Sequence, residues 1–309
     1  MGAKLMKNPD FIAVDWGSTA FRAWAMTLDG AVLEAKSTED GLKSITNRDF
    51  EAVIRRSCGD WLSANPQVPI VLCGMVGSRT GWAEAPYVDC PVLPAGLAEQ
   101  AIHMTMDGHR LAILPGACTR NAHGDLDVMR GEELQLLGLV QTAGLSDAVI
   151  CIPGTHCKWA RLHDGALAEF RTFVTGELFQ LLRNQSLLGA LADGDAYDAA
   201  AFRRGVTRGA DYPLSHAVFA ARANTLGGTL TPTALSSYLS GILIGAEIAA
   251  QTIPDGAEVV LLASGVLADR YAAALEFRGI PSRLIDAKDA TRAGLLLAAQ
   301  QLWFQDVPA

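Results

Sequence analysis

The sequence contains no pair of cysteines with the spacing Cys-x-x-Cys, which is typical of zinc ribbons and thiol redox sites. Two of its cysteines, Cys73 and Cys151, lie in apolar runs that are typical of buried strands. Free cysteine is among the residues most often buried in protein cores. We therefore predict reduced, buried thiols rather than disulfides or metal ligands. The prediction covers Cys58, Cys73, Cys90, Cys118, Cys151 and Cys157.

The chain also has no excess of positive charge. It contains 25 lysines and arginines against 33 aspartates and glutamates, so its formal net charge is −8. Proteins that grip nucleic acid or anionic lipid present a basic face. The densest basic cluster, Arg203, Arg204 and Arg208 with Asp211 close by, is interpreted as the solvated face of a helix. We expect no nucleic-acid partner.

Long apolar runs are missing as well. No apolar stretch precedes the first predicted strand, so no signal peptide is expected at the N-terminus. The most apolar segment, Thr233–Ile253, contains Ser236, Ser237 and Glu247, which indicates a core helix rather than a membrane span. We therefore predict a cytoplasmic protein with no membrane association.

What the chain does contain is an ordinary globular composition. Half of its 309 residues are hydrophobic and 19% are charged, which suits two domains of roughly 150 residues each. Alternating apolar residues and an Asp-Gly hairpin predict three opening strands. Apolar residues at helical spacing then predict a helix behind Thr46 and Asn47, and another helix begins near Arg130. The predicted strands are Phe11–Asp15, Phe21–Thr27, Ala31–Lys36, Ile70–Cys73 and Leu111–Leu114.

The opening pattern occurs a second time. Gly154 follows Gly17 by 137 residues, and the hairpin residue Asp164 follows Asp29 by 135 residues. The matched order of strand, turn, strand, hairpin and strand indicates an internal duplication with a boundary near Gly144. The predicted domains are therefore residues 1–144 and 145–309. The second half is predicted to contain strands Ala148–Ile152, Lys158–Leu162, Ala166–Phe173 and Glu258–Leu262, helices within Gly176–Ile253 and from Val266, and a closing helix Asp289–Phe304.

The repeated glycine turns have the composition of phosphate-binding loops. Backbone N–H groups in such turns form anion-binding concavities, and glycine lets the backbone approach a phosphate closely. Ser18, Thr19 and Thr155 add hydroxyl donors, Lys158 adds a positive charge, and Asp15 suits Mg²⁺. The alternatives are that Asp15 only caps its own turn and that Lys158 is a surface residue. A P-loop is excluded, because no Gly-x-x-x-x-Gly-Lys-Ser/Thr run is present.

Four segments of the chain carry a family resemblance. The first and last of them, with the late Ser264-Gly265 turn, resemble the superfamily of sugar kinases, actin and heat-shock chaperones. All four together resemble the 2-dehydro-3-deoxygalactonokinases, in that family's order and over nearly the whole chain. The resemblance implies an α/β fold with two ribonuclease-H-like domains around an ATP cleft. The segments are residues 14–19 (VDWGST), 74–82 (GMVGSRTGW), 129–133 (MRGEE) and 153–159 (PGTHCKW).

The resemblance also implies roles for the residues of both turns. It makes the first turn one phosphate loop, in which Asp15 also serves Mg²⁺, and the second turn the other phosphate loop, with Lys158 nearby. For His156 a phosphate hydrogen bond is favoured over a metal bond, because the other histidines show no metal spacing. The residues are Asp15, Gly17, Ser18 and Thr19 in the first loop, Gly154, Thr155 and His156 in the second, and Ser264, Gly265 and Val266 beneath the adenosine.

Phosphoryl transfer to a hydroxyl group needs a base or a carboxylate that orients the acceptor. Gly131-Glu132 at the start of a helix resembles the Gly-Asp step of related polyol kinases, so we nominate Glu132 as the catalytic residue, beside Asp15. The alternatives are Asp127 and Glu133. Acids at a helix N-terminus also stabilise the helix by about 0.3–1 kcal/mol with no catalytic role.

A sugar acid also carries a carboxylate, which favours a bidentate arginine. The run from Gly77 to Trp82 offers close backbone approach, one guanidinium fork and one flat apolar wall. The alternatives are that Arg79 forms a surface ion pair and that Trp82 belongs to the core. The predicted substrate-binding residues are Arg22, Ser78, Arg79, Trp82 and Arg130.

The function that the resemblance implies is transfer of the γ-phosphoryl group of ATP, with Mg²⁺, to the 6-hydroxyl of 2-dehydro-3-deoxy-D-galactonate in galactonate breakdown. The partners are then two small molecules, ATP and the sugar acid. Two alternatives stay open: a kinase for another sugar or sugar acid, and an ATPase that uses the nucleotide as a switch. A homodimer is compatible with the sequence.

Overall fold

The computed structural model describes residues 8–304, which form two compact units. The first unit contains the described residues up to Asp147, the segment Leu162–Glu169 and the described residues from Ala287 onward. The second unit contains Ala148–Arg161 and Phe170–Asp286. Two segments on the C-terminal side of the predicted boundary thus group with the first unit, and the predicted domain limits stay a prediction.

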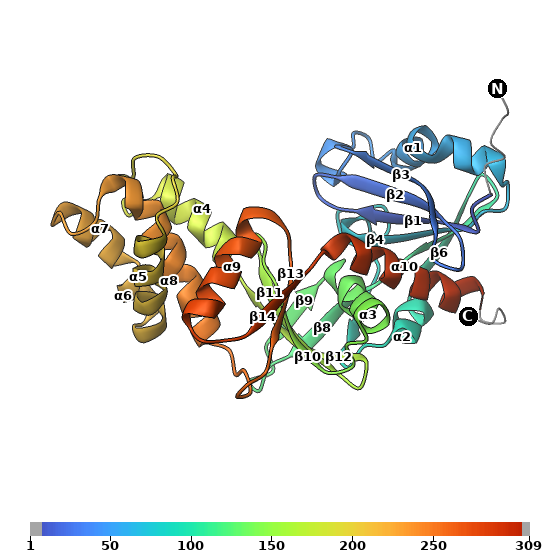
Figure 1. Cartoon of the computed structure of the whole chain (residues 1–309). Helices are drawn as coiled ribbons and strands as arrows, with labels where there is room; N and C mark the ends of the chain where they lie inside the picture. Colours follow the sequence, from blue (N-terminus) through green and yellow to red (C-terminus); the bar gives the residue numbers. More distant parts are fainter. Residues whose placement is uncertain (1–7, 305–309) are drawn as a thin grey trace, which may run out of the picture. The chain divides into compact units, whose positions relative to one another are not determined.

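The first unit is built on a six-stranded mixed sheet with the order β3-β2-β1-β4-β7-β6 (Figure 1). β1 pairs antiparallel with β2 and parallel with β4, so the carboxyl ends of β1 and β4 lie at the same edge of the sheet. The strands are β1 Phe11–Trp16, β2 Phe21–Met26, β3 Val32–Thr38, β4 Ile70–Gly74, β6 Ile102–Met106 and β7 His109–Ile113.

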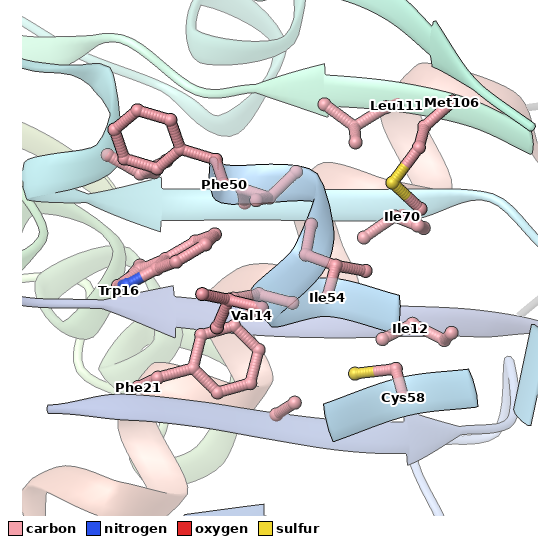
Figure 2. Packing of buried hydrophobic residues seen from close by; sticks show 14 of the residues in the cluster. Ile12, Val14, Trp16, Phe21, Phe50, Ile54, Cys58, Ile70, Met106 and Leu111 are labelled. Atoms are coloured by element: carbon pink, nitrogen blue, oxygen red, sulfur yellow. The ribbon is translucent and has the colours of Figure 1, made fainter. Parts of the chain in front are cut away.

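One face of this sheet is covered by α1, Phe50–Ala64. The helix begins at an Asp49 cap, whose carboxylate accepts a hydrogen bond from the Ala52 N–H. Phe50, Ile54 and Cys58 recur every fourth residue and so point to the same side, where they meet Trp16 and other strand residues in the buried core (Figure 2). This packing holds the end of β1, and the turn that follows it, against a rigid support.

The closing helix α10, Ala287–Trp303, returns to the first unit, where it packs on β1, β4, α2 (Pro94–Glu99) and α3 (Glu132–Ala143). A separate three-stranded sheet has the order β5-β8-β9, with β5 at Tyr87–Asp89, β8 at Gly116–Arg120 and β9 at Leu126–Met129. β9 ends directly before the start of α3, so this small sheet positions the helix N-terminus.

The second sheet repeats the strand order of the first. Its order β12-β11-β10-β13-β14 corresponds to β3-β2-β1-β4-β7, and its three last strands are parallel like their counterparts. The duplicated strand pattern of the sequence therefore occurs in both sheets, and the predicted α/β class is confirmed. The strands are β10 Ala148–Ile152, β11 Cys157–His163, β12 Ala166–Phe173, β13 Val259–Leu262 and β14 Ser282–Ile285.

Helices make up most of the second unit. The apolar helix α8 is buried over most of its length and packs closely on α5. It is therefore a core helix, as predicted, and within residues 8–304 no helix combines the length and apolar character that crossing a membrane requires. The helices are α4 Thr175–Gln185, α5 Ala199–Asp211, α6 Leu214–Ala217, α7 Phe219–Leu226, α8 Leu235–Ala249 and α9 Gly265–Phe277.

The prediction of buried thiols is confirmed for five of the six cysteines. All six cysteines are free, and five of them are buried, while Cys90 is half-buried.

Candidate active site

Asp15 lies at the carboxyl end of β1 in the first unit. Its carboxylate accepts a hydrogen bond from Arg22 on the paired strand at 3.2 Å, and 19% of its side chain is exposed. Burial raises the pKa of Asp15, Arg22 opposes this rise, and the negative charge of Glu132 adds to it. Asp15 is therefore a largely buried carboxylate whose negative charge Arg22 balances only in part.

The first glycine turn follows Asp15 and is held by backbone hydrogen bonds. The Gly17 N–H donates to the Ala20 carbonyl at 2.9 Å. The carbonyls of Gly17 and Ser18 accept from the N–H groups of Leu42 and Lys43 at 3.1 and 3.0 Å. These hydrogen bonds fix the backbone of the turn. A loop that presents N–H groups to an anion needs a fixed backbone of this kind.

The N-terminus of α3 lies beside the same edge of the sheet. Gly131 has φ 105°, which only glycine adopts readily, and a Cβ at this position would lie 3.4 Å from the Gly74 Cα at the end of β4. Glu132 follows as the first helical residue, and its carboxylate accepts a hydrogen bond from the Arg130 N–H at 3.3 Å. The predicted catalytic pair, Asp15 and Glu132, is therefore brought together at the ends of β1 and β4.

Glu133 differs from Glu132 because it is fully buried. Its Oε2 accepts from the Gly131 N–H at 2.7 Å, whereas its Oε1 has no hydrogen-bond partner among the described residues. Burial and, next, the charge of Glu132 raise the pKa of Glu133 to about 8. At neutral pH Glu133 is thus mainly a neutral acid that supports the helix start, which makes it a poor proton acceptor compared with its half-buried neighbour.

We expect Glu133→Gln to change the pH dependence of stability. Below about pH 4.5 the folded and unfolded forms both hold the Glu133 proton. Between about pH 4.5 and 8 only the folded form holds it, so the free energy of unfolding falls as pH rises through this window. Gln resembles the protonated acid. The free energy of unfolding, measured with urea in the absence of metal, should be equal for the variant and the wild type near pH 5. Near pH 8.5 it should be higher for the variant by about 3 kcal/mol. Equal pH slopes for the two proteins would contradict this.

The predicted sugar-acid loop follows β4. Arg48 donates a hydrogen bond to the Trp82 carbonyl at 3.2 Å, and the Trp82 ring stacks on Phe50 with ring centroids 5.8 Å apart. Trp82 is thus half-buried against the core, as its alternative interpretation proposed. Arg79 is exposed and makes no hydrogen bond or ion pair with any described residue, so its guanidinium is available to an anion.

Arg130 lies under this loop. Its Nη2 donates to the Ala85 carbonyl at 2.8 Å, and its guanidinium stacks on Tyr87 at 4.4 Å from the ring centroid. Its Nε and Nη1 are buried and lack hydrogen-bond partners within residues 8–304, and a Cβ at Gly77 would lie 2.9 Å from Nη1. Arg130 therefore supports the loop through its hydrogen bond to Ala85. Its Nε and Nη1 donors have no partner in the part of the chain that the structure describes, and Nη1 lies close to Gly77.

The second glycine turn, in the second unit, is bound by the N-terminus of α4. The Glu177 N–H donates to the Thr155 carbonyl at 3.0 Å, and the Glu177 carboxylate pairs with His156 Nε2 at 2.6 Å. Gly176 packs directly on the turn, because an added Cβ would overlap the Gly154 carbonyl. The sequence analysis placed the start of the helical region at Gly176, within one residue of the start of α4, but did not identify its contact with the turn.

A cavity of about 480 Å³ opens beside this turn, entirely within the second unit. It includes the predicted residues Gly154, Thr155 and Val266, and the Ser264-Gly265 turn leads into its wall at α9. Arg183, which the sequence analysis missed, donates to Ser236 Oγ at 2.6 Å and pairs with Asp195 at 3.1 Å along the same wall. Further polar lining comes from Thr175, Gln180, Asn184, Ser237, Ser240 and Arg270.

Comparison with known proteins gives the family. The family model described as 2-keto-3-deoxy-galactonokinase matches residues 15–298. The chain belongs to this family. It is 38% identical over 300 residues to a protein of Rhizobium meliloti (strain 1021) assigned as 2-dehydro-3-deoxygalactonokinase DgoK1, covering 95% of this chain and 97% of that one. It is also 37% identical over 289 residues to the 2-dehydro-3-deoxygalactonokinase of Escherichia coli (strain K12), covering 92% and 96%.

The fold of the family is represented among solved structures. A crystal structure from Sinorhizobium meliloti, of a protein assigned to the same enzyme, has a TM-score of 0.84 to this chain at 38% identity and covers 95% of this chain and 99% of its own. The resemblance found in the sequence motifs is thereby confirmed for the 2-keto-3-deoxy-galactonokinase family as a whole.

The carboxylates of this family member fit a magnesium ion. Mg²⁺ prefers oxygen ligands and is bound by one or two carboxylates plus waters and phosphate. Asp15 and Glu132 supply such oxygens, and a nearby cation would favour the ionised form of Asp15, whose pKa is raised first by burial and also by the charge of Glu132. Among residues 8–304, two groups of three side chains lie close enough together to hold a metal, and neither contains Asp15. They are the buried Cys151, Cys157 and Glu247, and the exposed Asp147, His163 and Asp164.

Proposed function

We propose that the protein transfers the γ-phosphoryl group of ATP to the C6 hydroxyl of 2-dehydro-3-deoxy-D-galactonate, in the breakdown of galactonate. The observation that carries this proposal is the family match over residues 15–298, together with relatives of the same name at 37–38% identity over almost their whole length. The paired carboxylates at the ends of β1 and β4 supply chemistry of the required kind.

We assign the nucleotide to a cleft between two ribonuclease-H-like domains. The turn Gly17-Ser18-Thr19 from one domain and Gly154-Thr155-His156 from the other hold the phosphates, with Lys158 as a cation. Ser264, Gly265 and Val266 lie beneath the adenosine, in line with the cavity that Val266 lines in the second unit. Lys158 is 5% exposed, so its alternative interpretation as a surface residue is wrong.

We assign Mg²⁺ to Asp15, directly or through water. The ion would neutralise charge on the phosphates and help to orient the γ-phosphoryl group. The remaining groups position the reactants, which is the main task of a protein in phosphoryl transfer.

Glu132 orients the acceptor in this proposal. Its carboxylate accepts the proton of the C6 hydroxyl as the oxygen attacks the γ-phosphorus, the bond to the β-γ bridging oxygen breaks, and ADP leaves. Glu132 suits this role better than Glu133, because Glu133 is fully buried and holds its own proton near neutral pH. Asp127 stays an alternative that mutagenesis can remove.

The sugar-acid carboxylate is assigned to Arg79, with Ser78, Trp82, Arg22 and Arg130 as further contacts. The exposed guanidinium of Arg79 makes no ion pair with residues 8–304, so its N–H groups can form two parallel hydrogen bonds to a carboxylate. Arg22 also donates a hydrogen bond to Asp15, so part of its role is to hold that carboxylate.

We expect Arg79→Lys to raise the KM of the sugar acid about tenfold while the KM of ATP changes less than twofold. Lysine keeps the charge but cannot form the two parallel hydrogen bonds of a guanidinium. The matched control is Arg120→Lys on β8, an exposed arginine outside the predicted site, which should leave both constants unchanged. Steady-state kinetics with each substrate varied in turn measures the effect. An equal rise in both constants would argue against a sugar-acid contact.

A substrate panel distinguishes this function from its two alternatives. Initial rates of ADP formation are measured with MgATP and a set of sugar acids, neutral sugars and polyols. Activity confined to 2-dehydro-3-deoxygalactonate supports the proposal. Activity that is higher with a neutral sugar favours another sugar kinase, and ATP hydrolysis that no acceptor changes favours a nucleotide switch. A cytoplasmic location and a homodimer stay proposals from the sequence, and sedimentation of the purified protein tests the second.

A further inference from the structure

Helix α8 carries one charged side chain in an otherwise apolar and polar-uncharged helix. Glu247 is 2% exposed, and its carboxylate lies beside the buried thiol of Cys157 and accepts hydrogen bonds from three further side chains. Trp159 Nε1 donates to Oε1 at 2.7 Å, Tyr271 Oη donates to Oε2 at 2.9 Å, and Thr175 Oγ1 also donates to Oε2. These donors come from β11, α9 and α4, so a single carboxylate connects four elements of the second unit.

Each of the three donors belongs to a segment that contributes to the candidate nucleotide site. Trp159 adjoins the buried Lys158 on β11. Thr175 is the first residue of α4, beside Gly176, which packs on the second glycine turn. Tyr271 lines the same cavity as Val266, one turn further along α9.

The chemistry of the donors explains why a carboxylate occupies this position. An indole N–H only donates, and a buried hydroxyl donates best to an ionised acceptor. Glutamate accepts all three hydrogen bonds, whereas glutamine has one acceptor oxygen and would face a second donor group toward them. Burial raises the pKa of Glu247 and the hydrogen bonds oppose this rise. Burying a carboxylate carries a desolvation penalty, and an apolar residue at this position of α8 would avoid that penalty.

We infer that Glu247 is a positioning residue of the nucleotide site, which holds the start of α4, the lysine-bearing strand β11 and the wall of α9 in one fixed arrangement. The inference rests on the proposed function, because it assumes that the nucleotide binds in the second unit. Glu247 is not among the residues that line the cavity beside the second glycine turn, and it acts through Thr175, Trp159 and Tyr271.

The test compares Glu247→Gln with two variants that each remove one donor, Tyr271→Phe and Thr175→Val. We expect Glu247→Gln to raise the Kd of ADP, measured by calorimetry, and the KM of ATP at least tenfold. The single-donor variants should raise both about threefold. The KM of the sugar acid should change less than twofold in all of them. Glu258→Gln, an exposed glutamate paired with Arg283 in the same unit, is the matched control and should change nothing.

Three results overturn the inference. The first is a lower melting temperature with unchanged ADP affinity and KM of ATP, which indicates a purely structural role. The second is an equal rise in the KM of both substrates. The third is wild-type ADP affinity in both single-donor variants, which decides the matter even if Glu247→Gln does not fold. If the wild type binds no nucleotide, the proposed function itself is wrong, and calorimetry on the wild type separates that outcome from the others.

Discussion

Replacing Asp15 with asparagine is expected to lower kcat about 10³-fold. The carboxylate ends β1 beside the first glycine turn, and an amide there carries no charge to hold a cation near the phosphates. Loss of one preorganised electrostatic contact of this kind is worth about 4 kcal/mol of transition-state stabilisation, which corresponds to that factor. The free enzyme should stay folded, because asparagine keeps the size of the side chain and removes a carboxylate whose pKa is raised by burial and, to a smaller extent, by the charge of Glu132.

The measurement is kcat as a function of Mg²⁺ concentration at saturating ATP and sugar acid. The variant should also need more Mg²⁺ for half of its maximal rate. Asp60→Asn on α1 is the matched control, since 86% of that side chain is exposed and it pairs only weakly with Lys36 at 3.6 Å. A variant at position 15 with the wild-type rate and the wild-type Mg²⁺ dependence would show that Asp15 merely caps its turn.

Replacing Glu132 with glutamine is expected to lower kcat about 10²-fold or more and to leave ADP affinity unchanged. The amide cannot accept the proton of the acceptor hydroxyl, and general-base contributions have this size. The start of α3 should be preserved, because Gly131 and its hydrogen bond to Glu133 are not altered. Loss of a negative charge near the helix N-terminus changes stability by only about 0.3–1 kcal/mol.

Two neighbouring acids serve as controls for Glu132. Glu133→Gln tests the buried acid behind it, and Asp127→Asn on β9 tests the remaining candidate. Single-turnover rates separate the chemical step from product release in all three variants. A near-normal rate for Glu132→Gln, combined with a large loss in one of the other two, would move the base to that residue.

The sequence predicted most of the regular structure that supports this site. The predicted limits of Ala148–Ile152 and Ala166–Phe173 match β10 and β12, because apolar alternation and Asp-Gly turns are local signals. The three-stranded sheet β5-β8-β9 was missed. Its strands have three to five residues, and β5 pairs with a strand nearly thirty residues away, so no local pattern defines them.

The candidate site was predicted only where a motif marks it. Asp15, Glu132 and the two glycine turns lie in recognisable runs, whereas Arg183, Glu177 and Glu247 do not. Their importance comes from contacts between segments distant in the sequence, such as the 88 residues between Trp159 and Glu247. Burial likewise separates Glu132 from Glu133, which look equivalent in the sequence but differ in exposure because they face different sides of α3.

The most direct test of the proposed transfer follows the phosphoryl group itself. The purified protein is incubated with MgATP and 2-dehydro-3-deoxy-D-galactonate, and the products are examined by phosphorus NMR. We expect one ADP and one sugar-acid monoester, with the phosphorus coupled to the protons on C6, and far less monoester from the gluconate epimer. Appearance of inorganic phosphate with no phosphorylated sugar acid would contradict the account.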